Sequence, residues 1–140
     1  MSNEKTLSII KPDIIKKNLN GEIINFLEKK GFKIMGMKMI KMTPELAKEF
    51  YQEHQARSFF PEMIKFISNS PVIIMCLERE NAVKFNREIM GATNPQEAQE
   101  GTIRKIFGTN IDNNAVHGSD SPQSAEREIN LFFKKEELFI

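Results

Sequence analysis

Four apolar stretches along the chain have the length and composition of β-strands. Residues 5–10 and 32–42 form two of them, the second alternating weakly and rich in methionine. Residues 71–78 contain the unbroken apolar run VIIMCL, which is typical of a central strand covered on both faces. A brief fourth strand is expected at His117. Pro12 ends the first strand, because proline cannot donate a hydrogen bond to a neighbouring strand.

Apolar side chains recur at spacings of three and four residues within five other stretches, which predicts helices that contain residues 19–27, 46–50, 60–67, 82–89 and 125–132, the second beginning at Thr43-Pro44 and the last at Ser121-Pro122. Gly31 is expected to close the first helix. The second and third are expected to form a helical hairpin with Phe59 near its tip, outside the apolar register and partly exposed. Asn81 and Ser121 are the expected N-caps of the last two helices.

These elements alternate as strand, helix, strand, helical hairpin, strand, helix, loop, strand, helix. Without the hairpin this is the βαββαβ order of a ferredoxin-like α/β fold (an α+β sandwich), in which helices cover one four-stranded antiparallel sheet. A length of 140 residues fits one domain, 1–140, with a proper core. The same layout also serves RNA-binding and regulatory domains, so function has to be argued from particular residues.

The charge balance of the chain is close to neutral, with a formal net charge of +1 and 28% charged residues. It gives no electrostatic support for binding nucleic acid or an anionic membrane. We expect neither a signal peptide nor a membrane span, since no apolar run approaches ~18 residues. The single cysteine, Cys76, is expected in the core, and its lack of a disulfide partner fits the cytoplasm.

The segment 114–122, NAVHGSDSP, combines a histidine with several groups that could tune it. A lone histidine is more often structural than catalytic, but the neighbours of His117 favour chemistry. A helix beginning at Ser121 and Pro122 would place the ring beside a helix N-terminus, where anions are favoured. Ser119 and Glu128 are a hydroxyl and a carboxylate that could orient the imidazole.

The same segment, NAVHGSD, resembles the active-site signature of nucleoside diphosphate kinases. Four other stretches resemble that family in the same order: Lys11-Pro12-Asp13, MGATNP at 90–95, GTIR at 101–104 and the helix at 121–133. The resemblance therefore extends over essentially the whole chain.

This resemblance implies ping-pong transfer of a γ-phosphoryl group from a nucleoside triphosphate, typically ATP, to a nucleoside diphosphate. His117 would be the nucleophile and carry the phosphoryl group as phosphohistidine. Mg²⁺ would arrive with the nucleotide phosphates, so no all-protein metal site is expected. Because the base would stack on a ring with no side chain reading its edges, we expect broad tolerance of base and sugar.

Ten further residues acquire roles from the resemblance. Lys11, Arg87 and Arg104 match the cations that hold the phosphates, and Thr93 matches a hydroxyl contact to them. Asn114, together with Lys11, matches contacts to the sugar hydroxyl region.

The remaining matches concern the base and the supports of the site. Phe59 matches the aromatic on which the base stacks, with Met63 on the same wall. Tyr51 matches a residue that braces Lys11. Ser119 and Glu128 match the shell around the histidine.

Two positions depart from the family pattern: Asn113, where many relatives carry a basic residue, and Met63, where leucine is frequent. Relatives are tetramers or hexamers built from a common dimer, so the apolar end 138–140 is expected to lie against a neighbouring subunit.

Two other functions remain open. One is a nucleotide-binding relative without catalysis, against which the intact residue set argues. The other is an RNA-binding domain, which would need paired strand aromatics and a basic face that this sequence lacks.

Overall fold

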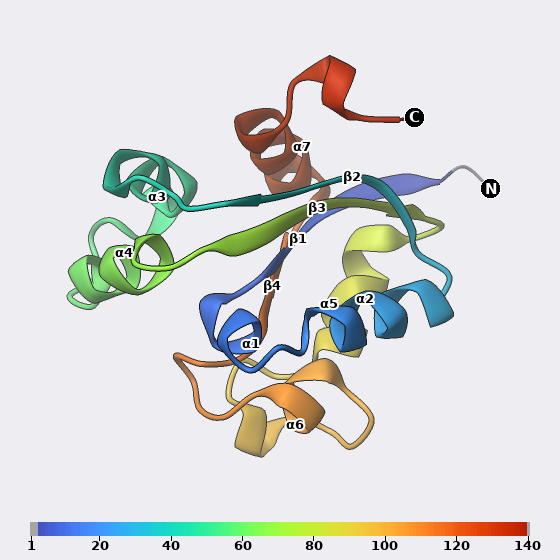
Figure 1. The fold of residues 1–140 in the computed structure, drawn as a ribbon, viewed down its shortest axis with the longest axis horizontal. Helices are drawn as coiled ribbons and strands as arrows, with labels where there is room; N and C mark the ends of the chain where they lie inside the picture. The colour runs from blue at the N-terminus through green and yellow to red at the C-terminus, as the bar shows by residue number, and fades with distance from the viewer. Residues whose placement is uncertain (1–2, 140) are drawn as a thin grey trace.

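The computed structural model describes residues 3–139 and contains one four-stranded sheet in the order β2-β3-β1-β4 (Figure 1). The strands are β1 (Glu4–Ile10), β2 (Lys33–Ile40), β3 (Val72–Arg79) and β4 (Val116–Gly118). All three neighbouring pairs are antiparallel. The predicted ferredoxin-like α+β arrangement is therefore confirmed.

Seven α-helices and three short 3₁₀ turns lie between and after these strands in the described part of the chain. The helices are α1 (Pro12–Lys16), α2 (Asn20–Lys29), α3 (Pro44–Phe50), α4 (Phe60–Ser68), α5 (Ala82–Met90), α6 (Ile103–Phe107) and α7 (Pro122–Phe132). The 3₁₀ turns are Gln52–His54, Pro95–Glu97 and Lys135–Glu137. Among residues 3–139, none of the helices combines the length and apolar character needed to cross a membrane.

The two faces of the sheet carry separate hydrophobic cores. On β3, Ile74 and Cys76 pack into the core shared with α3, α4 and α7, whereas Ile73 and Met75 pack into the core shared with α1, α2, α5 and α6. Successive side chains of a strand point to opposite faces, so an unbroken apolar run is what a doubly covered strand needs. Figure 1 shows α7 on one side of the sheet and α1, α2, α5 and α6 on the other.

Most predicted element ends agree with the structure. Gly31 follows α2 with a φ of +90°, and Phe32 N donates to Leu27 O, as in a glycine-terminated helix. Ser121 Oγ accepts a hydrogen bond from Ser124 N at 3.1 Å and so caps α7.

Three local features differ from prediction. Helix α1 was not predicted, because its five residues are too short to display a helical repeat. Asn81 precedes α5 in a left-handed conformation and makes no side-chain cap. Instead, Glu4 Oε1 accepts from Val83 N at 2.8 Å. The second strand is also shorter than expected and has an irregular register between Ile34 and Gly36.

The predicted hairpin is formed by α3 and α4, which contact each other and pack on the β2 side of the sheet. Phe59 precedes α4 and is 47% exposed, as its position outside the apolar register indicated. At the other end of the chain, Leu138 packs over Gly36, whereas Phe139 is 80% exposed. The last residue of the predicted apolar tail, Ile140, lies outside the described residues.

Candidate active site

A tight turn delivers His117 onto the edge of the sheet. Val116 N donates to Asn114 O at 2.9 Å across Ala115, whose φ is +77°. This is a γ-turn with an unfavourable backbone conformation for a residue with a side chain. The buried Asp13 holds it, because its Oδ2 accepts from Ala115 N at 3.1 Å. The strand that follows pairs with β1, placing His117 opposite Ile9.

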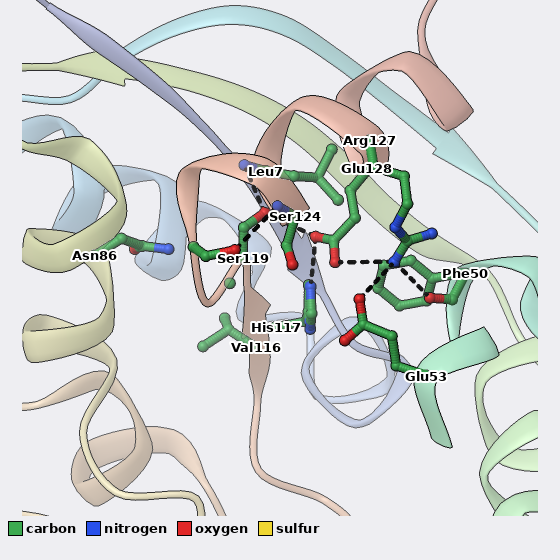
Figure 2. A network of polar contacts seen from close by, with 12 residues as sticks. Leu7, Phe50, Glu53, Asn86, Val116, His117, Ser119, Ser124, Arg127 and Glu128 are labelled. Carbon is green, nitrogen blue, oxygen red and sulfur yellow. Dashed lines mark hydrogen bonds and ion pairs between the residues drawn. The ribbon is translucent and has the colours of Figure 1, made fainter. Parts of the chain in front are cut away.

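One edge of the His117 ring is fixed by two residues that follow it. Nε2 lies 3.1 Å from Glu128 Oε1, and the same oxygen accepts a 2.7 Å hydrogen bond from Ser119 Oγ (Figure 2). Ser119 is in turn tied to β1 through Leu7 N and Leu7 O. Since a carboxylate only accepts hydrogen bonds, we assign the ring proton to Nε2. The lone pair of the neutral imidazole is then on Nδ1.

Close packing surrounds both the ring and the backbone beside it. The Phe50 ring meets His117 edge-on, with centroids 4.8 Å apart and planes at 77°. A side chain at position 118 would collide with Met90 Sδ and the Asn86 amide, so α5 approaches the backbone beside His117 more closely than any residue but glycine permits.

His117 lines a cavity of about 830 Å³ at one end of the sheet. Eight of the eleven predicted site residues line this cavity: Lys11, Tyr51, Phe59, Met63, Thr93, Arg104, Asn114 and His117. They come from six separate segments, which the fold brings together around the free edge of the histidine. A cavity of this size accommodates a small-molecule ligand such as a nucleotide.

Lys11 is a buried cation in the wall of this cavity. Its Nζ donates to Asn114 Oδ1 at 2.8 Å and to Asp112 O at 3.0 Å, and it lies 5.3 Å from the centre of the Phe66 ring. Burial lowers the pKa of Lys11 from 10.5 to about 8, and the nearby Asp13 counteracts only part of that effect. The Asn114 amide is held at both ends, because its Nδ2 donates to Thr93 O at 3.0 Å.

Arg104 is buried and joins three backbone segments of the site. Its guanidinium donates to the carbonyls of Asn114, Gly91 and Val116 at 3.3, 3.1 and 2.9 Å. Burial, reinforced by the neighbouring Arg87, lowers the pKa of Arg104 to about 10, so the group stays charged at neutral pH. Three of its five N–H groups are used, which leaves one on each terminal nitrogen for a ligand.

Three predicted site residues lie outside the cavity wall. Ser119 and Glu128 stand behind the imidazole, as described above. Arg87 is exposed on α5, and its Nη1 donates to Gly118 O at 3.3 Å, next to the histidine.

Tyr51, which the resemblance matches to a brace for Lys11, lies in the same cavity wall as Lys11, and its ring packs on Phe50 with centroids 4.7 Å apart. Burial and the nearby Glu128 raise the pKa of Tyr51 well above its usual range, so the phenol remains protonated.

Six other cavity residues had no site role predicted from the sequence: Arg57, Glu62, Phe66, Ile111, Asp112 and Val116. Arg57 stacks over the Phe59 ring at 5.6 Å. Ile111 is 56% exposed, which is unusual for isoleucine, but this exposure is a property of the fold that no local sequence pattern marks. No group of three or more His, Cys, Asp or Glu side chains able to hold a metal lies within residues 3–139.

This arrangement suits the transfer of an anionic group. A neutral imidazole with one fixed edge offers a nucleophile, and buried cations with free donors neutralise charge on the group attacked. Phe59, the exposed aromatic residue in the cavity wall, offers a stacking surface.

Comparison with known proteins agrees with these features. The sequence model of the family described as "Nucleoside diphosphate kinase" matches residues 4–138. Two relatives of that name, from Persephonella marina and Bdellovibrio bacteriovorus, are 51% and 54% identical over 138 residues, covering 99% of this chain and 99% and 98% of theirs.

Solved structures give the same result. A nucleoside diphosphate kinase from Aquifex aeolicus superposes with a TM-score of 0.95 at 44% identity, covering 98% of this chain and 99% of its own. A halophilic one from Halobacterium salinarum, solved in complex with CDP, also has a TM-score of 0.95, at 41% identity and 98% and 91% coverage. The chain belongs to the nucleoside diphosphate kinase family.

Proposed function

We propose that this protein transfers the γ-phosphoryl group of a nucleoside triphosphate to a nucleoside diphosphate, through a phosphohistidine on His117. The observation that carries the proposal is the histidine itself: its Nε2 edge is held by Glu128, and its ring lines a cavity that also contains Lys11 and Arg104. The Halobacterium relative was solved with CDP, which is a nucleoside diphosphate.

In the first half-reaction, the lone pair of Nδ1 attacks the γ-phosphorus. The P–N bond forms while the bond to the β,γ-bridging oxygen breaks, and the nucleoside diphosphate leaves with that electron pair. The ring becomes more positive as it is phosphorylated. Glu128 stabilises this positive charge because its carboxylate accepts the hydrogen bond from Nε2–H, and Ser119 keeps the carboxylate in place.

In the second half-reaction, a terminal oxygen of another nucleoside diphosphate attacks the phosphohistidine. The P–N bond breaks and its electrons return to Nδ1, so one site handles donor and acceptor in turn. Neither nucleophile has to lose a proton. The protein therefore contributes orientation and cations, for which Lys11, Arg104 and Arg87 are the proposed sources.

The base is proposed to stack on Phe59, beside Met63, with Asn114 and Lys11 toward the sugar and Thr93 toward the phosphates. A ring accepts any base by stacking, so we expect broad tolerance. A preference of about a hundredfold in kcat/KM for one base would contradict this part of the proposal.

Mg²⁺ is proposed to enter as part of the nucleotide substrate. This cation is commonly held by substrate phosphates together with one or two carboxylates. Asp112 and Glu62 are the carboxylates in the cavity wall that such a complex would approach.

We also propose that the enzyme works in the cytoplasm as a homo-oligomer, a tetramer or hexamer. The buried free thiol of Cys76 supports the compartment, because a reducing cytoplasm keeps thiols unpaired. The exposed apolar side chains of Met37, Met39 and Phe139 support the oligomer.

The proposal is tested by incubating the protein with γ-labelled ATP and Mg²⁺ in the absence of an acceptor. We expect an acid-labile, alkali-stable label on the wild type that any nucleoside diphosphate removes. His117→Ala should take up no label, whereas the matched variant His54→Ala, which changes the other histidine, should label normally. Absence of label on folded wild type would refute the proposal and favour a nucleotide-binding relative without catalysis.

A further inference from the structure

Arg127 occupies a position on α7 from which it reaches the end of another helix. Its Nη1 donates to Glu49 O and its Nη2 to Phe50 O, each at 3.3 Å. These carbonyls belong to the last turn of α3, where backbone acceptors lack partners within the helix. A cation is favoured at this end of a helix, so Arg127 joins α3 to α7.

The same guanidinium also lies between two carboxylates of very different exposure (Figure 2). Nη2 is 3.7 Å from Glu128 Oε2 and 3.8 Å from Glu53 Oε1. The Glu53 side chain is 54% exposed, and such pairs contribute little in water. The Glu128 side chain is only 7% exposed, and a buried carboxylate depends strongly on a compensating charge.

Both oxygens of Glu128 therefore have a defined partner. Oε1 accepts a hydrogen bond from Ser119 Oγ and lies next to His117 Nε2, and Oε2 lies next to the Arg127 guanidinium. A carboxylate that is hydrogen-bonded at one oxygen and attracted by a cation at the other turns less freely about its terminal bond than one held at a single oxygen. The position of the acceptor opposite Nε2 thus depends on Arg127.

Arg127 also acts on the second support of the ring. Phe50, whose carbonyl it binds, is the residue whose ring meets His117 edge-on. Arg127 itself lines no part of the nucleotide cavity. It touches the two groups that hold the imidazole without touching the imidazole or its ligand.

We propose that Arg127 is a positioning residue for phosphoryl transfer, which aligns His117 by fixing Glu128 and Phe50 together. This inference rests on the proposed function. Loss of the guanidinium leaves the cavity wall intact, so nucleotide affinity is retained. The rate at which His117 is phosphorylated falls, because the ring and the carboxylate that accepts its hydrogen bond are no longer held in one geometry.

The first test measures single-turnover phosphorylation of His117 at several concentrations of γ-labelled ATP with Mg²⁺. We expect Arg127→Met to lower the saturating rate about tenfold to a hundredfold, with the half-saturating concentration unchanged within about twofold. Arg127→Lys should recover most of the rate, since it restores a cation at the same position.

Two variants serve as controls. Arg79→Met removes another arginine that binds backbone carbonyls, those of Lys30 and Glu80, far from the histidine. Glu53→Gln removes the exposed partner of Arg127 but not the buried one. Both should phosphorylate at close to the wild-type rate.

A spectroscopic measurement separates positioning from stability. The chain has only two histidines, so ¹⁵N chemical shifts resolve the tautomer of His117 in the intact protein. We expect the Nε2–H form to dominate in the wild type and in Arg127→Lys, and a mixture of tautomers in Arg127→Met. If Arg127→Met does not fold, Arg127→Gln keeps a donor for the α3 carbonyls without the charge and is expected to give the same two results.

The inference fails if folded Arg127→Met phosphorylates His117 at the wild-type rate with an unchanged tautomer. It also fails if Arg79→Met loses as much rate as Arg127→Met, since the effect would then be general destabilisation. A wild type that takes up no label overturns the proposed function instead, and the tautomer comparison still tests the contact between Arg127 and Glu128.

Discussion

Lys11 owes its properties to its burial more than to its partners. Only 9% of the residue is exposed, and the Asn114 oxygen and Asp112 carbonyl that it contacts carry no full charge. The energetic penalty on its charged form is what lowers its pKa to about 8. An incoming polyphosphate would supply the missing negative charge.

Nucleotide affinity is therefore expected to fall as the pH rises through about 8, where Lys11 loses its proton in the free protein. Calorimetric titration with ADP and Mg²⁺ between about pH 7 and pH 9.5 would measure this, with a loss approaching tenfold per pH unit if the charge is required. Lys11→Met should bind weakly with little pH dependence over the same range. A steep pH dependence in that variant would assign the effect to another group.

Stability is expected to change in the opposite direction with pH. Because the folded pKa of Lys11 lies below its ordinary value of 10.5, the unfolded chain binds more protons between about pH 8 and 10.5. The contribution of Lys11 to the free energy of unfolding therefore rises with pH across that window. Urea unfolding of wild type and Lys11→Met at both ends of the window would reveal it as a smaller pH dependence in the variant.

Phe59 is the proposed stacking surface, and its exposure makes a direct test possible. Phe59→Ala is expected to raise KM for purine and pyrimidine nucleotides alike by roughly tenfold to a hundredfold, the equivalent of about 1–3 kcal/mol of stacking. Stability should change little, because the residue is 47% exposed. An increase confined to one base would show that Phe59 reads base identity.

Single site residues were identified from the sequence mainly where they stand in the family's motifs. His117, Asn114 and Glu128 belong to one continuous stretch, so their proximity followed from a strand, a turn and a helix. Arg57 and Ile111 carry no such signal. They reach the cavity only because the α3–α4 hairpin and the loop before β4 meet in three dimensions, which local patterns do not encode.

At the level of elements, the turn before β4 is the part of the site under most strain. Ala115 is buried and adopts a conformation that side chains disfavour, and Asp13 from α1 binds its N–H. The adjoining carbonyls of Asn114 and Val116 accept from Arg104. The turn is thus held by a carboxylate on one side and a guanidinium on the other.

Asp13→Ala is expected to destabilise the fold by about 1–3 kcal/mol, since it leaves a buried N–H without an acceptor. The same substitution at the exposed Asp120 should cost about 1 kcal/mol or less. Urea unfolding curves of the two variants would measure the difference. Equal midpoints would mean that the turn needs no support from Asp13.

Elements were predictable in proportion to their length and periodicity. The apolar run of β3 and the amphipathic pattern of α7 are long enough to identify both elements, and both are found where expected. Helix α1 has only five residues, too few to show a helical repeat. The positive φ of Ala115 could not be predicted either, because alanine is not a residue type that marks such a conformation. The turn at Ala115 is stabilised by contacts with Asp13 and Arg104. These contacts join residues that are about a hundred positions apart or on separate elements, so no local pattern predicts them.

For the whole molecule, the apolar surface that stays exposed along the edge strand β2 bears on assembly into oligomers. Strand β2 lies at the edge of the sheet and exposes Met37 and Met39 by 51% and 55%. The tail runs beside this strand, because Phe139 N donates to Met35 O at 2.8 Å. Exposed apolar edges of this kind are usually paired or covered in stable proteins.

Light scattering after size-exclusion chromatography is expected to give a mass of four or six times 16.2 kDa. Met37→Lys combined with Met39→Lys should reduce the mass if the β2 edge takes part in assembly, because buried unpaired charges oppose association. A wild-type mass of 16.2 kDa would refute the proposed oligomer. The sequence alone offered only the apolar ending as a hint, since exposure depends on which strand lies at the edge.

The site is assembled from both helical layers and the short strand between them. Phe50 and Glu128 belong to the layer of α3 and α7, whereas Lys11 and Arg104 belong to the layer of α1 and α6. Proteins open in cooperative parts at free energies below that of global unfolding. Any partial opening that displaces either layer therefore removes half of the proposed site residues while the other layer stays folded. On gradual heating, the rate of phosphoryl transfer is therefore expected to fall at a lower temperature than the helical content, because activity requires both helical layers to be folded.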